Sequence, residues 1–266
     1  MFNQNLSRHK VFAIANQKGG VGKTTTSINL ATGLAAVGLK ILLIDLDPQG
    51  NASTGLGIEK NDREINSYSV ISGDFELIDA IKKSKIPNLD IIAATVDLMG
   101  AEIELIEQDN RGYKLDNAIK NMVKGKKYDY ILIDCPPALG LLTLNALTAA
   151  DSVLVPLQCE FFALEGLSQL MKTVEMVKLS FNPDLKLDGI ILTMFDKRNN
   201  LSEQVAEDAR KNLGTRVFKT IIPRNVRISE APSHGIPALV YDHKCSGSVA
   251  YMNLAKEFIE RETTQV

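Results

Sequence analysis

The stretch that decides the fold of this chain is the loop at 18–25, Lys18-Gly19-Gly20-Val21-Gly22-Lys23-Thr24-Thr25. It follows the short apolar run VFAIA at 11–15 and opens an Ala-rich segment with helical spacing, the order that a phosphate-binding loop requires. Glycines let backbone N–H groups turn toward phosphate oxygens, and the N-terminal end of the helix adds positive potential. In such a loop Lys23 reaches the β- and γ-phosphates of a nucleotide, and the Thr24 hydroxyl ligates Mg²⁺.

The loop departs from the common pattern G-x-x-x-x-G-K-[ST] at its first glycine. The chain has Gln17 at that position and carries an additional lysine, Lys18. KGGVGKTT is the deviant Walker A signature, so the sequence resembles the ParA/MinD superfamily of ATPases. The resemblance implies that residues 18–25 bind ATP between the two subunits of a homodimer. It also implies that Lys18, the match to the family's signature lysine, reaches the nucleotide of the other subunit.

Further motifs resemble the chromosome-partitioning branch of that superfamily, called ParA or Soj. They are ANQKGGVGKTT (15–25), DLDPQGN (45–51), LIDCPP (132–137), LTLNALTAAD (142–151), ALEGL (163–167) and IPRNVRISEAPSHG (222–235). Only the stretch 58–90 and the extreme termini carry no family motif. The resemblance implies an ATPase whose ATP-bound dimer coats double-stranded DNA nonspecifically. A ParB-like centromere-binding protein would release it by stimulating hydrolysis, which would segregate a chromosome or plasmid.

The composition and the apolar patterning predict an α/β fold. A chain of 266 residues with 45% hydrophobic and 23% charged residues is neither disordered nor collagen-like. Runs of consecutive apolar residues are typical of strands covered on both faces. Seven such runs recur, VFAIA (11–15), ILLI (41–44), LDIIA (89–93), YILI (130–133), SVLVP (152–156), GIILT (189–193) and VFKTII (217–222). We therefore expect one doubly wound, mostly parallel sheet with helices on both faces, as in P-loop NTPases.

The segments between these runs predict the helices and the domain organisation. Two stripes have helical spacing, one of Leu164, Leu167, Leu170, Met171, Val174 and Val177, the other of Leu201, Val205, Ala209 and Leu213. The widest gap, at 46–88, is expected to hold short helices and mobile loops. We expect a single domain over 1–266 that begins with a flexible segment at 1–9, without a separate N-terminal DNA-reading domain.

Three carboxylates follow predicted strands. Asp45 and Asp47 come after ILLI, and Asp134 ends YILI. Ligands of open α/β sheets bind at the carboxyl ends of the strands, so these groups are placed to meet a metal, although an Asp after a strand can also cap a helix or a turn. The resemblance implies that Asp47 positions the attacking water and that Asp134 holds Mg²⁺ through water. Lys18, Lys23 and Asp47 would then form the catalytic set, because phosphoryl transfer depends on alignment and charge neutralisation.

A turn near the C-terminal third is the candidate adenine site. Relatives bind the base near the end of the strand that matches GIILT and at a Pro-Arg-Asn turn, here Pro223-Arg224-Asn225. Pro223 and Asn225 are therefore expected at the nucleotide, because the Asn225 amide offers both a donor and an acceptor to the base edge. An ordinary β-turn is the alternative.

The chain as a whole is not a polycation, because 30 Lys and Arg residues against 32 Asp and Glu residues give a net charge of −2. The segment 186–227 carries +4. Its basic residues are Lys186, Lys197, Arg198, Arg210, Lys211, Arg216, Lys219, Arg224 and Arg227, and its acidic residues are Asp188, Asp196, Glu203, Glu207 and Asp208. Such a segment can bind DNA phosphates, or it can be a solvated face. The family resemblance favours DNA, with Arg198 and Arg227 matching the arginines that bind it.

Two other functions compete with this interpretation. A MinD-like ATPase that binds membranes would need a basic amphipathic C-terminal helix, whereas Glu257, Glu260 and Glu262 outweigh Lys256 and Arg261 here. Core packing is the better explanation of its apolar side, which is formed by Met252, Ala255, Phe258 and Ile259. The other competitor is a nucleotide-gated DNA-binding switch in which hydrolysis is incidental.

The cysteines and the N-terminus indicate the compartment. Cys135, Cys159 and Cys245 have no close pairing, which argues against a disulfide framework, a zinc site or a bridging iron–sulfur cluster. The apolar run at 11–15 is too short for a signal peptide or a membrane span. The sequence therefore predicts a cytoplasmic protein that associates with the nucleoid and not with the membrane.

Overall fold

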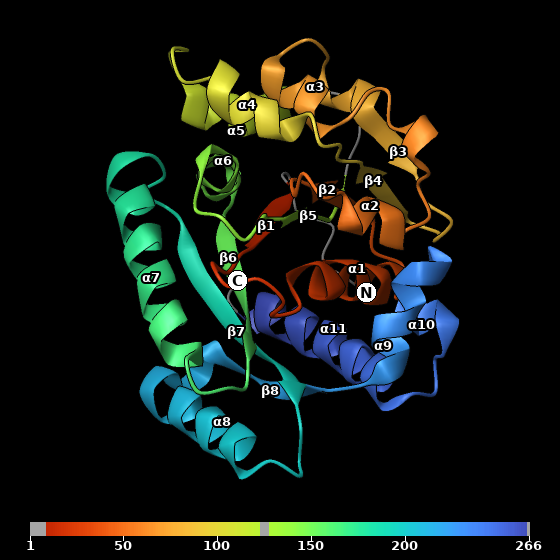
Figure 1. Ribbon diagram of the computed structural model, residues 1–266, viewed down its shortest axis with the longest axis vertical. Helices are drawn as coiled ribbons and strands as arrows, with labels where there is room; N and C mark the ends of the chain where they lie inside the picture. Colours follow the sequence, from red (N-terminus) through yellow and green to blue (C-terminus); the bar gives the residue numbers. More distant parts are fainter. Residues whose placement is uncertain (1–8, 123–127, 265–266) are drawn as a thin grey trace.

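The computed structural model describes residues 9–122 and 128–264, which form a sheet of eight strands covered by helices (Figure 1). The strand order is β3-β4-β2-β5-β1-β6-β7-β8. The strands are β1 (Lys10–Ile14), β2 (Ile41–Asp45), β3 (Ile81–Lys83), β4 (Leu89–Ile92), β5 (Tyr130–Asp134), β6 (Ser152–Gln158), β7 (Lys186–Phe195) and β8 (Val217–Pro223). All neighbours pair in parallel except β3 with β4. The predicted fold class and its seven strands are confirmed, and β3 is an additional edge strand that was not predicted.

The strands are apolar on consecutive positions because helices cover both faces of the sheet. In β1, Val11 and Ala13 pack into one hydrophobic core, and Phe12 and Ile14 pack into the other. Figure 1 shows α6 (Leu141–Ala149) and α7 (Ala163–Ser180) on one side, and α1 (Lys23–Ala36) and α11 (Ser246–Thr264) on the other.

The remaining helices include those predicted from periodicity. The stripes at 164–177 and 201–213 lie in α7 and α8 (Asn200–Leu213), and both predictions are confirmed. The gap at 46–88 holds α2 (Asn51–Gly55), α3 (Ser67–Ser72), short 3-10 turns and β3. The other helices are α4 (Leu98–Glu104), α5 (Lys114–Met122), α9 (Val226–Glu230) and α10 (Ala238–Tyr241).

Helix α11 packs its apolar side into the core between α1 and β8. Ala255 and Phe258 are fully buried, and the Phe258 ring lies 4.9 Å from that of Phe12. Helices α1 and α11 approach so closely that a Cβ on Gly33 would lie 2.9 Å from the Cβ of Ala255. Met252 is 36% exposed and was wrongly placed on the buried side of α11. Within the described ranges, no helix is both long and apolar enough to cross a membrane.

The N-terminal expectation concerns residues that lie mostly outside the described ones. Residues 1–8 are not among them, and His9, the last residue of the expected flexible segment, is buried.

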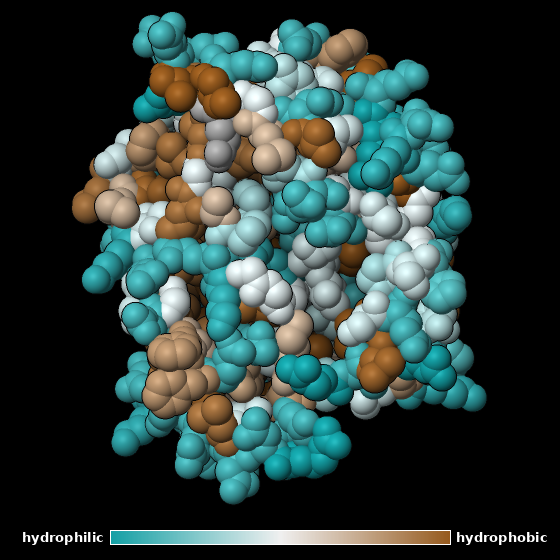
Figure 2. All heavy atoms as spheres, viewed as in Figure 1, coloured by the Kyte–Doolittle hydropathy of each residue, from teal (hydrophilic) through white to brown (hydrophobic). Residues whose placement is uncertain are grey.

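Apolar side chains also gather on the surface. Figure 2 shows them at the upper left of a mostly hydrophilic face, over α4 and the end of α7, where Met99, Ile103, Met176 and Leu179 are exposed.

Candidate nucleotide site

Glycines shape the loop between β1 and α1 at the point where the helix begins. Gly20 and Gly22 have φ values of +74° and +87°, which L side chains rarely adopt. Gly22 is the N-cap residue of α1 and has no side chain to cap the first N–H groups of the helix. These donors and the helix dipole therefore point at the space where an anion can bind.

Neighbouring strands hold the loop in place. Asn16 is buried, its Nδ2 donates to the carbonyl of Pro156 in β6 at 2.7 Å, and its Oδ1 accepts from Lys18 N at 3.1 Å. Thr193 in β7 donates its hydroxyl to the carbonyl of Val21 at 2.8 Å. The loop is thereby tied to the carboxyl ends of β6 and β7.

Lys23 is one of the few buried cations. It is 6% exposed, and its Nζ donates to the carbonyl of Lys18 at 3.0 Å, across the loop. Burial lowers the pKa of Lys23, and the negative charges of Asp134 and Asp47 oppose that shift. The ammonium group is thus held over the loop in an environment where a phosphate would be a strong partner.

The additional lysine of the loop has a different environment. Lys18 is exposed over 42% of its side chain and forms an ion pair with Glu160, which follows β6. The next two residues, Phe161 and Phe162, are 73% and 62% exposed and pack edge to face with ring centroids 5.0 Å apart. Lys18 therefore lies on the surface, paired with a carboxylate that directly precedes an exposed aromatic pair in the chain, and it is available to another molecule once it leaves Glu160.

The three carboxylates converge beside the loop, as the strand ends predicted. Asp45 and Asp134 face each other in the β2–β5 register and are fully buried, and Asp47 is 8% exposed. Burial raises the pKa of Asp134 to about 8, and the negative charge of Asp45 adds to that rise. Hydrogen bonds from Ser27 and Thr24 act in the opposite direction.

The two oxygens of Asp134 differ in their contacts. Its Oδ1 accepts from the Ser27 hydroxyl at 2.8 Å, whereas its buried Oδ2 has no hydrogen-bond partner among the described residues. Within these residues, no cluster of three or more His, Cys, Asp or Glu side chains is placed to hold a metal alone. Mg²⁺ needs no such cluster, because it is usually held by one or two carboxylates, water and substrate phosphates. Ser27 was missed in the sequence, although it follows Thr24 closely on α1.

Asp45 has a different role from the one its position predicts. Its Oδ2 accepts from the Ser53 backbone N–H at 2.8 Å and from the Ser53 hydroxyl at 2.7 Å, and its Oδ1 accepts from Asp47 N at 3.2 Å. Burial raises the pKa of Asp45 to about 6. Both oxygens accept hydrogen bonds from the protein, so Asp45 orders the segment that carries Asp47.

The residues of the predicted adenine turn form hydrogen bonds with neighbouring protein segments. Pro223 ends β8 opposite Phe195, and Arg224 N donates to the Phe195 carbonyl at 2.9 Å. The Asn225 Oδ1 accepts from Arg227 N at 2.9 Å and so caps α9, while its Nδ2 donates to Ser246 at 2.9 Å. Asn directly before a helix is a capping signal, and this role of Asn225 was not among the predictions from the sequence.

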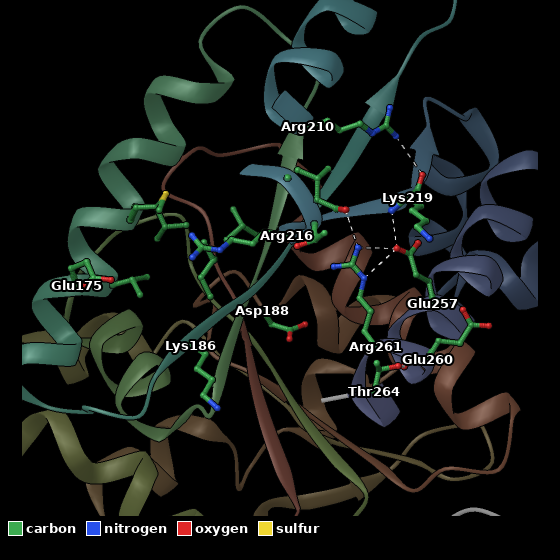
Figure 3. A pocket seen from close by; sticks show the side chains of 18 of the residues that line it. Glu175, Lys186, Asp188, Arg210, Arg216, Lys219, Glu257, Glu260, Arg261 and Thr264 are labelled. Atoms are coloured by element: carbon green, nitrogen blue, oxygen red, sulfur yellow. Dashed lines mark hydrogen bonds and ion pairs between the residues drawn. The ribbon is translucent and has the colours of Figure 1, made fainter. Parts of the chain in front are cut away.

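The basic segment at 186–227 is divided by the fold. Its residues were counted as one patch, but β7 has ten residues and spans about 30 Å at about 3.3 Å per residue. Arg198 and Arg227 follow the carboxyl ends of β7 and β8. Lys186, Arg210, Arg216 and Lys219 instead line a cavity of about 1110 Å³ at the amino ends of these strands (Figure 3). The prediction of one continuous basic surface is therefore wrong, because residues that are close in the sequence lie at opposite ends of β7.

Part of that cavity stabilises the irregular edge strand β8. Glu257 accepts from the backbone N–H groups of Lys219 and Thr220 at 2.7 and 2.8 Å, and Arg261 donates to the Val217 carbonyl at 2.9 Å (Figure 3). The Arg261 guanidinium also lies 3.8 Å from the centre of the Phe218 ring. These charges satisfy backbone groups where the β7–β8 register shifts.

Both predicted DNA-binding arginines carry carboxylate partners. Arg198 pairs with Asp196 through Nε at 2.9 Å and Nη2 at 2.8 Å, and this pairing lowers the pKa of Asp196 to about 2. Arg227 Nη1 lies 3.0 Å from Glu230 Oε2, and its Nε lies 3.7 Å from Asp242 Oδ2. The two arginine side chains are 87% and 54% exposed, so a phosphate can reach them from solvent.

Comparison with known proteins places the chain among nucleotide-binding proteins. A model of an AAA domain family matches residues 9–187. The chain is 58% identical to a chromosome partitioning protein ParA of Caulobacter vibrioides over 95% of both chains. It is 55% identical to the sporulation initiation inhibitor protein Soj of Bacillus subtilis over 93% of this chain and 97% of the relative. A solved cobyrinic acid a,c-diamide synthase of Mycobacterium smegmatis, with bound ATP analogue and magnesium, superposes with a TM-score of 0.84 at 35% identity, covering 97% and 98% of the two chains.

Proposed function

The chain belongs to the ParA/Soj family of chromosome-partitioning ATPases, and from that premise we propose that its ATP-bound homodimer holds DNA and releases it after hydrolysis. It is an ATPase, and ATP and Mg²⁺ are its cofactors, as in the solved relative with bound ATP analogue and magnesium. The observation that carries the nucleotide and metal part of the proposal is the buried Oδ2 of Asp134 beside the glycine loop, which has no hydrogen-bond partner within the described ranges.

The residues around the loop supply most of the phosphoryl-transfer machinery. Thr24 and Asp134 would hold Mg²⁺, which neutralises phosphate charge when bound. Lys23 and the N–H groups of the loop bind the phosphates of ATP, for which the free end of α1 is suited. Asp47 orients the attacking water, because it is the least buried of the three carboxylates and is ordered by Asp45. Pro223 and Asn225 are proposed to lie against the adenine.

Lys18 completes the site of the other subunit. Its exposure, and its ion pair with the residue that precedes the exposed Phe161 and Phe162, support a role at a subunit interface. A lysine that contacts the second nucleotide stabilises the dimer only when ATP is present, so dimerisation follows the nucleotide.

Lys18→Ala is therefore expected to bind ATP about as well as the natural chain and to stay monomeric. Light scattering with ATP, at a concentration where the natural chain is dimeric, measures this directly. Lys40→Ala, which removes an exposed lysine just before β2, is the matched control and should dimerise. An ATP-dependent dimer of Lys18→Ala would contradict the role of Lys18 between subunits.

DNA is proposed to bind at Arg198 and Arg227 through its phosphates. Exposed ion pairs such as that of Arg198 with Asp196 contribute little stability, so a phosphate can replace the carboxylate at small cost. Phosphate contacts carry no base information and release counterions, so binding is independent of sequence and sensitive to salt. Two such surfaces on one dimer raise the effective concentration for the second contact, which makes DNA affinity depend on ATP.

Substitutions at the two surface arginines should weaken DNA binding, and a substitution at the carboxylate beside Arg198 should strengthen it. Arg198→Glu and Arg227→Glu are each expected to weaken DNA binding. For each variant the loss should be the same for duplexes of unrelated sequence, and ATP-dependent dimerisation should be unchanged. Asp196→Asn removes the competing charge beside Arg198 and is expected to strengthen binding by a few-fold. Gel shifts over a range of salt concentrations test all three variants. If both charge reversals keep the natural affinity, these arginines belong to a solvated surface.

A ParB-like partner, a cytoplasmic location and association with the nucleoid complete the proposal. A MinD-like membrane function is the second candidate, and the burial of Ala255 and Phe258 argues against it, because these side chains are not available to lipid. The nucleotide-gated switch is distinguished by the behaviour of Asp47→Asn, described in the Discussion.

A further inference from the structure

Arg63 is buried in a segment that carries no family motif. It is 6% exposed, and among the described residues only His9 and Lys23 are comparably buried basic side chains. Lys23 is explained by the phosphate loop. Arg63 is not explained by any ion pair, because within the described part of the chain no carboxylate lies within ion-pair distance of its guanidinium. A buried cation without a carboxylate partner needs several good acceptors.

The guanidinium of Arg63 finds those acceptors in the segment that follows Asp47. Its Nε and Nη2 donate to the Ile58 carbonyl at 3.2 and 2.6 Å, and Nη2 also donates to the Thr54 hydroxyl at 2.9 Å. Its Nη1 donates to the carbonyls of Gly50 and Ala94 at 3.4 and 3.2 Å. One side chain thus joins both ends of α2 to the end of β4.

The guanidinium of Arg63 packs so close to the backbone of Gly50 that it leaves no room for a side chain at position 50. Gly50 has a φ of +62°, and a Cβ there would lie 2.5 Å from Arg63 Nη1 and 2.9 Å from the Ala94 carbonyl oxygen. The backbone at this position therefore has two reasons to be glycine, the left-handed conformation and the guanidinium packed against it.

The turn that carries Asp47 is held at both ends. Asp47 N donates to Asp45 Oδ1 at its start, and Gly50 N donates to the Asp47 carbonyl at 2.8 Å at its end. The Gly50 carbonyl then accepts from Arg63. Burial lowers the pKa of Arg63, while the negative charge of Asp45 opposes that shift, so the two charges attract each other across the turn.

We propose that Arg63 is a positioning residue that fixes the Asp47 carboxylate for the hydrolytic step. This rests on the proposed function of Asp47 in orienting water. The planar, five-donor guanidinium is suited to holding several acceptors in a fixed relation, which an ammonium group cannot do. None of the hydrogen bonds described for the phosphate loop involves Arg63, so we expect the loss of Arg63 to leave ATP binding by the loop nearly unchanged.

The test compares Arg63→Met and Arg63→Lys with the matched control Arg261→Met. Arg261 is also a largely buried arginine that donates to a backbone carbonyl, but it lies at the far end of the sheet. For Arg63→Met we expect kcat to fall about tenfold to a hundredfold, as for a misplaced catalytic group, with KM for ATP and ATP affinity within about twofold. Arg63→Lys should recover part of kcat. Arg261→Met should lower the urea midpoint and leave kcat unchanged.

The alternative results are distinguishable. If folded Arg63→Met keeps the natural kcat, or if its loss appears in KM and ATP affinity alone, the positioning role is wrong. If Asp47→Asn, measured beside it, turns over normally, the proposed function of Asp47 fails and the inference fails with it. If Arg63→Met does not fold, Arg63→Lys decides the question, because it keeps the buried positive charge and removes the planar set of donors, so a natural kcat in folded Arg63→Lys overturns the proposal. A kcat loss at constant KM supports the proposal, and an unchanged kcat overturns it.

Discussion

Lys23→Ala is expected to abolish ATP binding in the concentration range where the natural chain binds. The ammonium group is buried over the phosphate loop, donates to the Lys18 carbonyl and is the charged partner of the phosphates. Removing one partner of a buried charged contact costs about 2–5 kcal/mol, which lowers affinity by at least about thirtyfold. Equilibrium binding of a fluorescent ATP analogue measures the loss.

The control for Lys23→Ala is the exposed Lys40→Ala, which should bind like the natural chain. Thermal unfolding without nucleotide shows whether the variant is folded. A folded Lys23→Ala with natural ATP affinity would mean that the glycine loop is not the phosphate site.

Asp47→Asn is expected to bind ATP, dimerise and remain on DNA while losing turnover. The substitution keeps the shape of the side chain and removes the charge that orients water, a loss of about a hundredfold or more in kcat. Asp47 lies outside the loop that binds the phosphates, so ATP affinity should change little. Steady-state phosphate release and ATP binding, measured on the same preparation, separate the two effects.

The same variant distinguishes a cycling ATPase from a nucleotide-gated switch. If hydrolysis drives release from DNA, cells that carry Asp47→Asn should fail to partition their DNA, although the protein binds it. Normal partitioning in these cells would favour the switch, in which hydrolysis is incidental.

Local patterns predicted the parts of the structure that depend on local chemistry. Consecutive apolar residues identified the buried parallel strands, since both of their faces are covered. They did not identify β3, because Ile81-Lys82-Lys83 is a short, polar, antiparallel edge strand with little to bury. The glycine loop and the carboxylates at the strand ends lie together as predicted, because parallel strands bring their carboxyl ends to one edge.

What could not be predicted depends on contacts between distant segments. The basic residues of 186–227 fall at opposite ends of β7, a separation that a charge count does not contain. Asp45 accepts hydrogen bonds from Ser53, and Asn225 caps α9. Residue type alone did not predict these roles, because they depend on which segments the fold brings together. Arg63 lies in the stretch without a family motif, and its importance follows only from the acceptors that the fold gathers around it.

The central claim is that ATP controls DNA binding through dimerisation. Retention of the natural chain on an arbitrary DNA duplex, measured over a range of salt concentrations with ATP, with ADP and without nucleotide, tests it most directly. We predict strong retention with ATP alone, a steep decrease of that retention with salt, and the same affinity for unrelated duplex sequences. Equal retention in all three nucleotide states, or retention that does not depend on salt, would contradict the account.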